Sequence, residues 1–569
     1  MTDQAHEGGA TLPPRRGAGR ALARAVPWLV FATVLGLYAT TQIRGFCPAY
    51  AEVDPDAYTF LAKRMALRQP LTVTSEDPFL YQLHMWVETA PGRVTSKYPP
   101  GFPLLMAVGY RLAGDRGVYM VSPVMGGLAL IAAWLLFRLW LRPLAATLAL
   151  VTLAIMAQFS FYGAYLLTHM TSLCLTTWGM YFLWRWLARP AWGWGLAAGA
   201  ILGAATTVRP TDGLLVLPLA AAALVGLWRG HRAGRIPWGA TLALGAAWAL
   251  PVMLLALFNY AQFGSPTVSG YALSGEQNTF SFDYLTRYFG MLMAGLNQAY
   301  LPLFFPLGLA GMMLIGAPAD RALRLLWLVP VLLIYGSYYW VNENWSYLRF
   351  FMGALPVCIG SAFALLERIP AGAVARTCAM VVLVGLHLAL NLGGLRNVFR
   401  GELIGHNPYE LARVAEKMEE KTAADAVVFA RGHLGYSLGP RRSYLLYDLD
   451  AFNRGHSLSR QRDADRKSRE YEPRRQPERV RRLREFYEGT TDVDLLEQRR
   501  NTVRQHLEAG RQVVFLLPAH QRASEAQALG DGFRLKPEEE WDLEWDAWGR
   551  RQKQRWGIYT VATVETAEG

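Results

Sequence analysis

The sequence predicts a polytopic α-helical membrane protein with a soluble α/β domain at its C-terminal end, and three observations support this. The chain has 569 residues, of which 52% are hydrophobic and 12% aromatic, too apolar a composition for an intrinsically disordered protein. The apolar residues form long blocks up to about residue 394. The rest is dense in Arg and Glu, so the mean hydropathy of +0.14 averages two unlike regions.

The membrane-spanning segments are predicted by their length, since a helix needs roughly 20 mostly apolar residues to cross a bilayer. Eleven segments qualify, some of them short or interrupted: 26–44, 117–140, 144–160, 165–184, 192–208, 213–228, 238–258, 302–317, 325–341, 350–366 and 372–391. The first is long and is followed by no small-residue cleavage site, so we interpret it as a retained anchor rather than a signal peptide.

Arginines indicate the orientation of these spans. They flank alternate connections, at positions 15, 16, 20, 24, 138, 142, 185, 189, 229, 232, 235, 321, 324 and 368. A cytoplasmic N-terminal tail (1–25) places all of them on the cytoplasmic side, as the positive-inside bias requires. The net charge of +13 is therefore chiefly an orientation signal, and no nucleic-acid partner is expected.

The opposite, outer side then carries the long connections 45–116 and 259–301 of the membrane domain (26–394), the short connection 342–349, and a soluble domain from 395 to 569. Apolar runs typical of buried strands recur in this last region between helical stretches, which predicts an α/β fold. The strands are expected at 426–430, 443–447, 513–517 and 558–564, the helices at 408–421 and 494–509, and a charged loop or helix face at 454–484.

Several common sites are missing from the sequence. It contains no phosphate-binding Walker loop, no dinucleotide glycine fingerprint and no HExxH motif. None of its four cysteines lies in the soluble region, so neither a disulfide framework nor a zinc ribbon is indicated there. Any chemistry must be driven by an activated substrate or by a gradient.

Two carboxylates stand directly after the first span. Asp54 and Asp56 precede an amphipathic stretch, Thr59–Arg68, at the bilayer face. Partial desolvation there raises the basicity of a carboxylate and suits it to take a proton from a hydroxyl. The alternative is that these residues only cap a helix, which Asp does well.

Farther along the same loop, Lys97 precedes a run of prolines and a short apolar segment, 104–112. The prolines prevent one helix from running through, and the apolar segment is too short to span, so it is expected to lie in the interface or to re-enter. Lys97 would then lie at the level of lipid phosphates, where it could bind a specific ligand or simply contact bulk headgroups.

These segments resemble the polytopic GT-C glycosyltransferases, and within them the family-39-like group of protein mannosyltransferases, aminoarabinose transferases and RgtA/B/C/D-like enzymes. The resemblance extends over about residues 26–391. It rests on the acidic first loop with Tyr58 four residues after Asp54, and on KYPPGFPLL (97–105), VRPTDG (208–213), FNY (258–260), FGSP (263–266), GY (270–271) and YLRFF (347–351) followed by Pro356.

The resemblance implies a mechanism and a set of residues. A sugar on a polyprenyl phosphate is attacked by an acceptor hydroxyl with inversion, and the lipid phosphate leaves. Asp54 matches the family's catalytic acidic residue, with Asp56 as second choice. Lys97 matches the family's lysine near the prolines and would hold the phosphate, with Tyr98 beside it. Arg349 could add charge at developing negative oxygens.

One departure from the family concerns His169. Many relatives carry a second acidic residue at the start of the fourth span, where this chain has Leu167-Thr168-His169-Met170. His169 could act as a base or hydrogen-bond partner, or be an ordinary histidine near a helix end. The substitution weakens the case for a metal held between two carboxylates, so no metal ligands are assigned, although a divalent cation is not excluded.

Other polar residues have a functional and a structural interpretation. Arg209 lies within a membrane segment, where charges are costly and often functional, but an ion pair with Asp212 at a tight turn explains both equally well. In the first loop, His84 and Trp86 could stack on a sugar or only pack. Glu276 and Asp283 in the second outer loop are weaker candidates.

The expected function is therefore transfer of a sugar from a polyprenyl-phosphate donor to a lipid, polysaccharide or protein acceptor of the cell envelope, at the outer face of a bacterial inner membrane. A transporter or flippase of lipid-linked sugars is the main alternative. It predicts half-repeats and ionisable residues near the bilayer midplane, whereas the charges here gather at the outer face. A third alternative is a non-catalytic scaffold whose outer domain binds envelope polymers.

Overall fold

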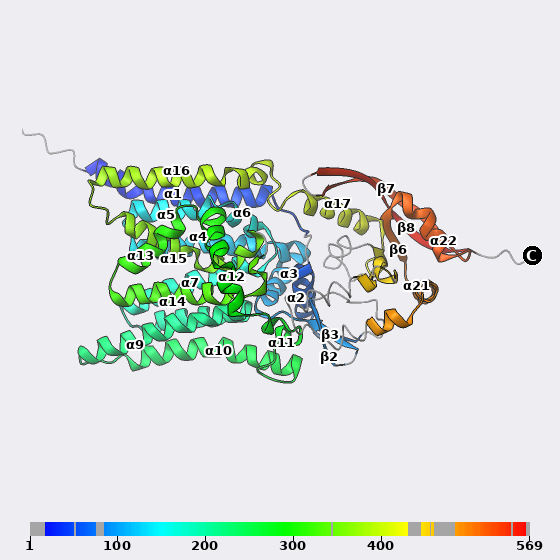
Figure 1. Ribbon diagram of the computed structural model, residues 1–569, viewed down its shortest axis with the longest axis horizontal. Coiled ribbons are helices and arrows are strands. Elements are labelled where there is room, and N and C mark those ends of the chain that lie inside the picture. Colours follow the sequence, from blue (N-terminus) through cyan, green and yellow to red (C-terminus); the bar gives the residue numbers. More distant parts are fainter. Residues whose placement is uncertain are drawn as a thin grey trace, which may run out of the picture.

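The computed structural model describes residues 17–49, 53–74, 85–90, 92–342, 345–430, 445–453, 455, 457–459, 484–547 and 550–564. Within them a long helical body is followed by a domain that contains a five-stranded sheet (Figure 1). Six helices are long and apolar enough to cross a membrane, and the number rises to eight if each of two bent helix pairs is one span. The predicted class, a polytopic helical membrane protein with a C-terminal sheet-containing domain, is confirmed.

The helical body follows the predicted apolar blocks closely. Its helices are α1 (Gly17–Arg44), α2 (Val53–Ala66), α3 (Gly101–Tyr119), α4 (Val121–Trp140), α5 (Pro143–Ala154), α6 (Ala157–Ala164), α7 (Thr168–Ala188), α8 (Trp192–Val208), α9 (Val216–Arg232), α10 (Trp238–Phe263), α11 (Gly270–Leu273), α12 (Phe282–Gly295), α13 (Phe304–Leu314), α14 (Pro318–Gly336), α15 (Leu355–Leu366) and α16 (Ala373–Arg400). All eleven predicted segments fall on helical residues, but the number of spans is not confirmed, because several of these helices are short or bent.

Two of the bends explain why sequence length alone misjudged the spans. α5 and α6 meet at 60°, and α12 meets α13 at 110° through a π-helical turn, Leu296–Tyr300. The region 259–301, expected to be an outer loop, therefore contains the helix α12. α12 is amphipathic, so its apolar residues lie on one face of the helix and form no unbroken run in the sequence. A search for unbroken apolar runs therefore does not find this helix.

α3 contains the short apolar segment that was expected to lie in the interface or re-enter. The helix breaks at Ala113 and Gly114, whose backbones are non-helical. Its two halves fold against each other so closely that a Cβ on Gly117 would lie 1.9 Å from the carbonyl oxygen of Gly109. Leu104, Val108 and Leu112 are exposed at four-residue spacing, so one apolar stripe faces outward, as an interfacial helix requires.

The C-terminal domain is built around a mixed sheet. Its strands are β4 (Val427–Ala430), β5 (Leu445–Asp448), β6 (Val513–Pro518), β7 (Phe533–Ala547) and β8 (Arg550–Thr563), in the order β5-β4-β6-β8-β7. The β5-β4-β6 pairs are parallel and the β6-β8-β7 pairs antiparallel. Helices α17 (His406–Lys421), α21 (Asp492–Glu508) and α22 (Arg522–Leu529) accompany the sheet. Of these elements, β7, which is rich in Glu and Trp, and the short helix α22 lack a counterpart among the predicted strands and helices.

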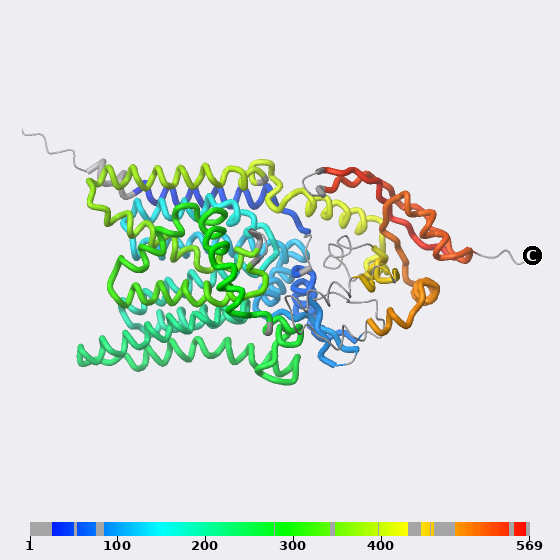
Figure 2. The backbone as a smooth tube through the Cα atoms, in the orientation of Figure 1, coloured from blue at the N-terminus to red at the C-terminus, as the bar shows by residue number. Residues whose placement is uncertain are grey.

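The helical body and the C-terminal domain are held together by packing and hydrogen bonding as well as by the connecting chain. Figure 2 traces the chain from α16 into α17 and the sheet. One continuous apolar core extends from the helical body to Leu411, Val428 and Ile558 of the C-terminal domain. The Tyr409 hydroxyl donates to the carbonyl oxygen of Gly45, at 2.6 Å, just after α1. The C-terminal domain therefore packs on the end of the helical body that carries the first outer loop.

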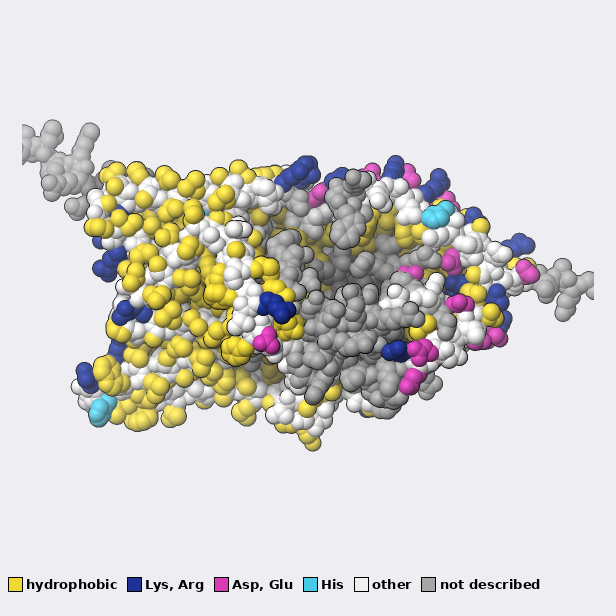
Figure 3. Space-filling view, in the orientation of Figure 1, with side chains coloured by type: hydrophobic (Ala, Val, Ile, Leu, Met, Phe, Trp, Pro, Cys, Tyr) yellow, Lys and Arg dark blue, Asp and Glu magenta, His cyan; other side chains and the backbone are white. Residues whose placement is uncertain are grey.

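Charge is distributed unevenly over the surface. In Figure 3 the helical body is mostly apolar, with Lys and Arg side chains at the end away from the C-terminal domain, whereas acidic and basic side chains mix over the C-terminal domain. The predictions for His84 and most of 454–484 lie outside the described residues.

Candidate functional site

A small antiparallel sheet positions the lysine of the first outer loop. Strands β1 (Val73–Thr74), β3 (Arg93–Ser96) and β2 (Trp86–Ala90) pair in that order, and the Lys97 amide donates to the carbonyl oxygen of Met85 at 3.0 Å. Pro99 and Pro100 cannot extend the strand because they lack an amide hydrogen, and α3 begins at Gly101. Lys97 and Tyr98 therefore occupy a fixed turn between a strand and a helix.

Asp54 faces this turn from α2. Its Oδ1 accepts a hydrogen bond of 2.7 Å from the Tyr98 hydroxyl. Tyr98 is buried, and burial followed by the charge of Asp54 raises the pKa of the phenol well above its ordinary value. The hydroxyl thus stays protonated and can only orient the carboxylate as a donor. The sequence places Tyr98 beside Lys97 among the substrate-binding candidates. In the structure the Tyr98 hydroxyl contacts Asp54, the predicted base.

Lys97 is paired with a residue that the sequence ranked low. Its Nζ lies 2.7 Å from Oε1 of Glu276, which belongs to the second outer loop, and the two side chains are 2% and 12% exposed. The two residues are 179 positions apart, so sequence spacing does not predict the pair. The loop that carries Glu276 packs tightly here, because a Cβ on Gly270 would lie 2.2 Å from the Lys97 carbonyl oxygen.

Tyrosines complete the surroundings of Asp54 and Lys97. The Tyr58 and Tyr98 rings lie 4.1 Å apart and the Tyr98 and Tyr271 rings 5.9 Å apart, while the Lys97 ammonium lies 5.4 Å and 5.7 Å from the Tyr98 and Tyr271 rings. We call Asp54, Tyr58, Lys97, Tyr98, Tyr271 and Glu276 the Asp54–Lys97 cluster. Tyr58 and Tyr271 were noted from the sequence only as family-like motif positions.

Asp56, the second choice for the base, lies in a different environment. Burial raises the pKa of its carboxyl to about 7, and a hydrogen bond from Trp86 opposes this only in part. Trp86 is 3% exposed and packs its ring 4.3 Å from that of Phe60, which agrees with the packing role rather than with sugar stacking. Since geometry precedes pKa in choosing a base, Asp54, which meets Tyr98, remains the first candidate.

A second group of polar residues gathers around Phe350. The Arg209 and Arg349 guanidinium groups lie 5.2 Å and 5.4 Å from the Phe350 ring, and both residues are buried. Arg209 also donates to the Tyr335 hydroxyl. We call Arg209, Arg349, His169, Tyr335 and Phe350 the Phe350 cluster. Asp212 lies close to this cluster, because its carboxylate acts electrostatically on Arg209. The carboxylate also accepts a hydrogen bond of 2.6 Å from the Ser172 hydroxyl.

His169 begins α7 and lies against the same ring. Its imidazole is 5.3 Å from Phe350 and 5.8 Å from Tyr162, and the residue is 4% exposed. Among the described residues neither ring nitrogen has a hydrogen-bond partner. A buried imidazole usually finds such a partner, so this ring is available to bind a further polar group.

The two clusters adjoin each other. Tyr58 of the first interacts through its hydroxyl with Thr168, the neighbour of His169, and senses the charge of Arg209. The start of α3 packs on the end of α8, where a Cβ on Gly101 would lie 2.3 Å from Oγ1 of Thr207. Asp54, Lys97, Arg209, Arg349 and His169 thus lie in one connected region. Asp283, in contrast, is exposed at the start of α12.

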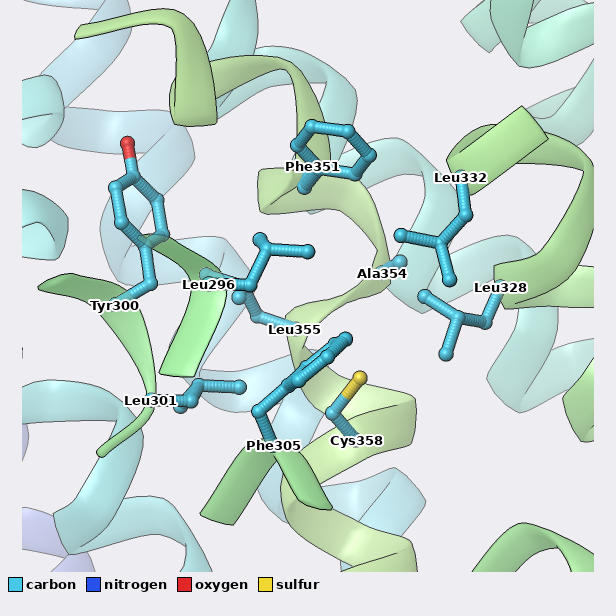
Figure 4. A pocket seen from close by; sticks show the side chains of 10 residues that line it. All are labelled: Leu296, Tyr300, Leu301, Phe305, Leu328, Leu332, Phe351, Ala354, Leu355 and Cys358. Carbon is cyan, nitrogen blue, oxygen red and sulfur yellow. The ribbon is translucent and has the colours of Figure 1, made fainter. Parts of the chain in front are cut away.

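No group of three or more His, Cys, Asp or Glu side chains that could hold a metal occurs in the part of the chain that the structure describes. Near the Phe350 cluster lies a small apolar pocket, lined by residues that include Leu296, Phe305, Phe351 and Leu355 (Figure 4). Its lining carries no charged side chain.

Known proteins resemble this chain in part of its sequence and in its fold. The model of the dolichyl-phosphate-mannose-protein mannosyltransferase family matches residues 97–254, a stretch that begins at Lys97. A search of curated proteins found no match.

Among solved structures, ArnT from Cupriavidus metallidurans bound to undecaprenyl phosphate matches with a TM-score of 0.55 and 14% identity over 96% of this chain and 98% of that one. Its apo form matches with a TM-score of 0.52 and 14% identity over 95% and 98%. The oligosaccharyltransferase AglB from Archaeoglobus fulgidus matches with a TM-score of 0.46 and 11% identity over 88% and 70%. The fold of this chain is therefore similar to that of ArnT over nearly the whole length of both chains.

Proposed function

We propose that this protein is an integral-membrane glycosyltransferase that moves a sugar from a polyprenyl-phosphate donor to an acceptor of the cell envelope. The observation that carries the proposal is the Asp54–Lys97 cluster, in which Tyr98 donates a hydrogen bond to the Asp54 carboxylate and Lys97, the neighbour of Tyr98 in the chain, is buried. The GT-C fold supports it, as does the bound undecaprenyl phosphate of the ArnT structure, a ligand of the class proposed here.

In the proposed reaction the acceptor hydroxyl attacks the anomeric carbon of the sugar from the face opposite the phosphate. The new carbon–oxygen bond forms as the bond to the phosphate oxygen breaks, which inverts the configuration. Asp54 takes the hydroxyl proton, and the bond electrons leave with the polyprenyl phosphate. Lys97 and Arg349 stabilise the charge that grows on that phosphate, while His169 and Arg209 bind polar groups of the substrates.

The proposed orientation places this chemistry at the outer face of a bacterial inner membrane, with the N-terminal tail in the cytoplasm and residues 395–569 outside. The arginines between the spans support it, as does the position of the C-terminal domain beside α2 and the small sheet (Figure 1). The acceptor is a lipid, a polysaccharide or a protein, and the sugar is a hexose or a pentose.

The test is incubation of the purified protein with a panel of polyprenyl-phosphate sugars, with loss of donor as the readout. We expect one donor to be consumed by the wild type and not by Asp54→Asn. Translocation of lipid-linked sugar in proteoliposomes without any transfer would favour the flippase alternative. Consumption at the wild-type rate by Asp54→Asn would remove the assignment of the base.

A further inference from the structure

The phosphate-binding role of Lys97, on which this inference rests, conflicts with the contact that Lys97 makes. Its ammonium lies 2.7 Å from the Glu276 carboxylate, and both side chains are buried or nearly so. A buried ion pair is neutral as a unit, and a phosphate brought to Lys97 would meet the carboxylate as a second anion. Like charges in contact inside a protein repel strongly because water does not screen them.

The neighbouring groups make this repulsion larger. Asp54 and Glu276 both act on the Tyr98 and Tyr271 phenols as negative charges. The Arg209 guanidinium acts on Tyr58 of this cluster, but its positive charge is itself balanced by the Asp212 carboxylate. With Glu276 in place, a phosphate at Lys97 would be a third anion beside Asp54 and Glu276, and the Lys97 ammonium is already paired with one of them.

The segment that bears Glu276 is held at both ends and turns sharply between them. At one end Gly270 packs on the Lys97 backbone. At the other, the Ser281 amide donates to the Ser337 carbonyl oxygen at 2.7 Å, and the Tyr339 amide donates to that of Thr279 at 3.1 Å. Glu276 itself opens a single 3-10 turn directly after Gly275, whose φ of 78° favours glycine. The Glu276 side chain has three rotatable bonds, so its carboxylate can change position while the backbone of the segment stays docked.

We propose that Glu276 is an exchangeable counter-anion that leaves Lys97 when the donor phosphate binds and returns to expel the polyprenyl phosphate after transfer. The donor is a phosphodiester with one negative charge. The product is a phosphomonoester, which carries more negative charge near pH 7. Without a competing carboxylate, Lys97 would bind the product more tightly than the substrate, and the enzyme would be trapped in its product complex. Glu276 opposes this trap.

The experiment measures binding of undecaprenyl phosphate to the purified full-length protein in detergent at fixed ionic strength. Glu276→Gln keeps the size of the side chain and removes its charge, so its Kd is expected to fall by about tenfold or more. Steady-state transfer should become more sensitive to inhibition by added undecaprenyl phosphate, because the product leaves more slowly. Asp283→Asn removes an exposed carboxylate of the same loop and should leave the Kd unchanged.

A second comparison tests whether the effect passes through Lys97. In a Lys97→Met background, adding Glu276→Gln should tighten binding by a smaller factor, because no ammonium is released and only the direct repulsion of the phosphate is removed. A Kd that rises or stays constant in Glu276→Gln alone would overturn the exchange and indicate that Glu276 only holds Lys97 in place. Failure of the wild type to bind undecaprenyl phosphate at any concentration would instead refute the proposed donor.

Discussion

The Tyr98 hydroxyl donates a hydrogen bond to Oδ1 of Asp54 across 2.7 Å. Tyr98 is fixed in the turn between β3 and α3, and Asp54 belongs to the first turn of α2. The bond therefore joins the two halves of the first outer loop and sets the direction in which the carboxylate points.

Replacement of Tyr98 by Phe should lower kcat with little change in the KM for the donor. A hydrogen bond to a charged group contributes about 1.5–3 kcal/mol, which corresponds to a loss of roughly tenfold to a hundredfold if the orientation of Asp54 is needed in the transition state. Steady-state kinetics separates the two constants. Tyr260→Phe, at an exposed tyrosine, is the matched control; an equal loss there, or a change confined to KM, would contradict the positioning role.

Replacement of Asp54 by Asn should reduce transfer by about 10²–10⁴-fold, the usual contribution of a general base. Asn keeps the volume and can still accept from Tyr98, so the protein should insert and elute as the wild type does on size exclusion. Asp56→Asn serves as comparison and should retain most activity. If instead Asp56→Asn is the inactive variant, the two roles are reversed.

Replacement of Asp56 by Asn should stabilise the protein at high pH. Burial raises the pKa of this carboxyl from 3.8 to about 7 in the folded state, so the folded protein favours the protonated form. The stability that this preference supplies is complete below about pH 4 and is lost as the pH rises through 7, up to about 4 kcal/mol at 1.36 kcal/mol per pKa unit, reduced by partial exposure.

Thermal unfolding of the two proteins in detergent between pH 4 and pH 8 measures this difference. The melting temperature of Asp56→Asn should exceed that of the wild type at pH 8 and equal it at pH 4. A difference that does not depend on pH would show that the folded protein does not raise the pKa of Asp56.

The sequence predicted the elements of the site better than their partners. Asp54 and Lys97 were found because acidic and basic side chains beside a span and a proline run are local signals. Glu276 was ranked low because its partner lies 179 positions away, and nothing local marks that contact. α12 was taken as loop because its apolar residues form no continuous run, and its bend of 110° toward α13 has no signal in the sequence. Packing of distant segments decides both features, and a single sequence does not encode it in any periodic pattern.

Replacement of His169 by Phe should preserve folding and reduce transfer by about tenfold or more, the loss expected for one hydrogen bond to a charged substrate group. The imidazole is buried beside Phe350 and Tyr162, so another ring fits the site. His169→Asn retains a donor and should recover part of the activity. Full activity of the Phe variant, measured as donor consumption, would mean that His169 is only a packing residue.

Replacement of Gly270 by Ala should weaken the docking of the second outer loop. The added methyl would lie 2.2 Å from the Lys97 carbonyl oxygen, and relief of such overlap typically costs about 1–3 kcal/mol. Limited proteolysis of the loop should become faster and transfer slower. Gly290→Ala, where nothing lies within 4 Å of the new methyl, should be neutral; equal behaviour of the two variants would argue against the tight contact.

The bond from Tyr409 to Gly45 has a consequence for how the molecule is made. The two residues are 364 positions apart, and Gly45 leads directly into the loop that carries Asp54. A growing chain inserts α1 early, but the partner of the Gly45 carbonyl is synthesised only after nearly all the membrane helices. The hydrogen bond to the Gly45 carbonyl can therefore form only after α17 has been synthesised. A chain that stops before α17 would contain the membrane helices but would lack this contact at the start of the first outer loop.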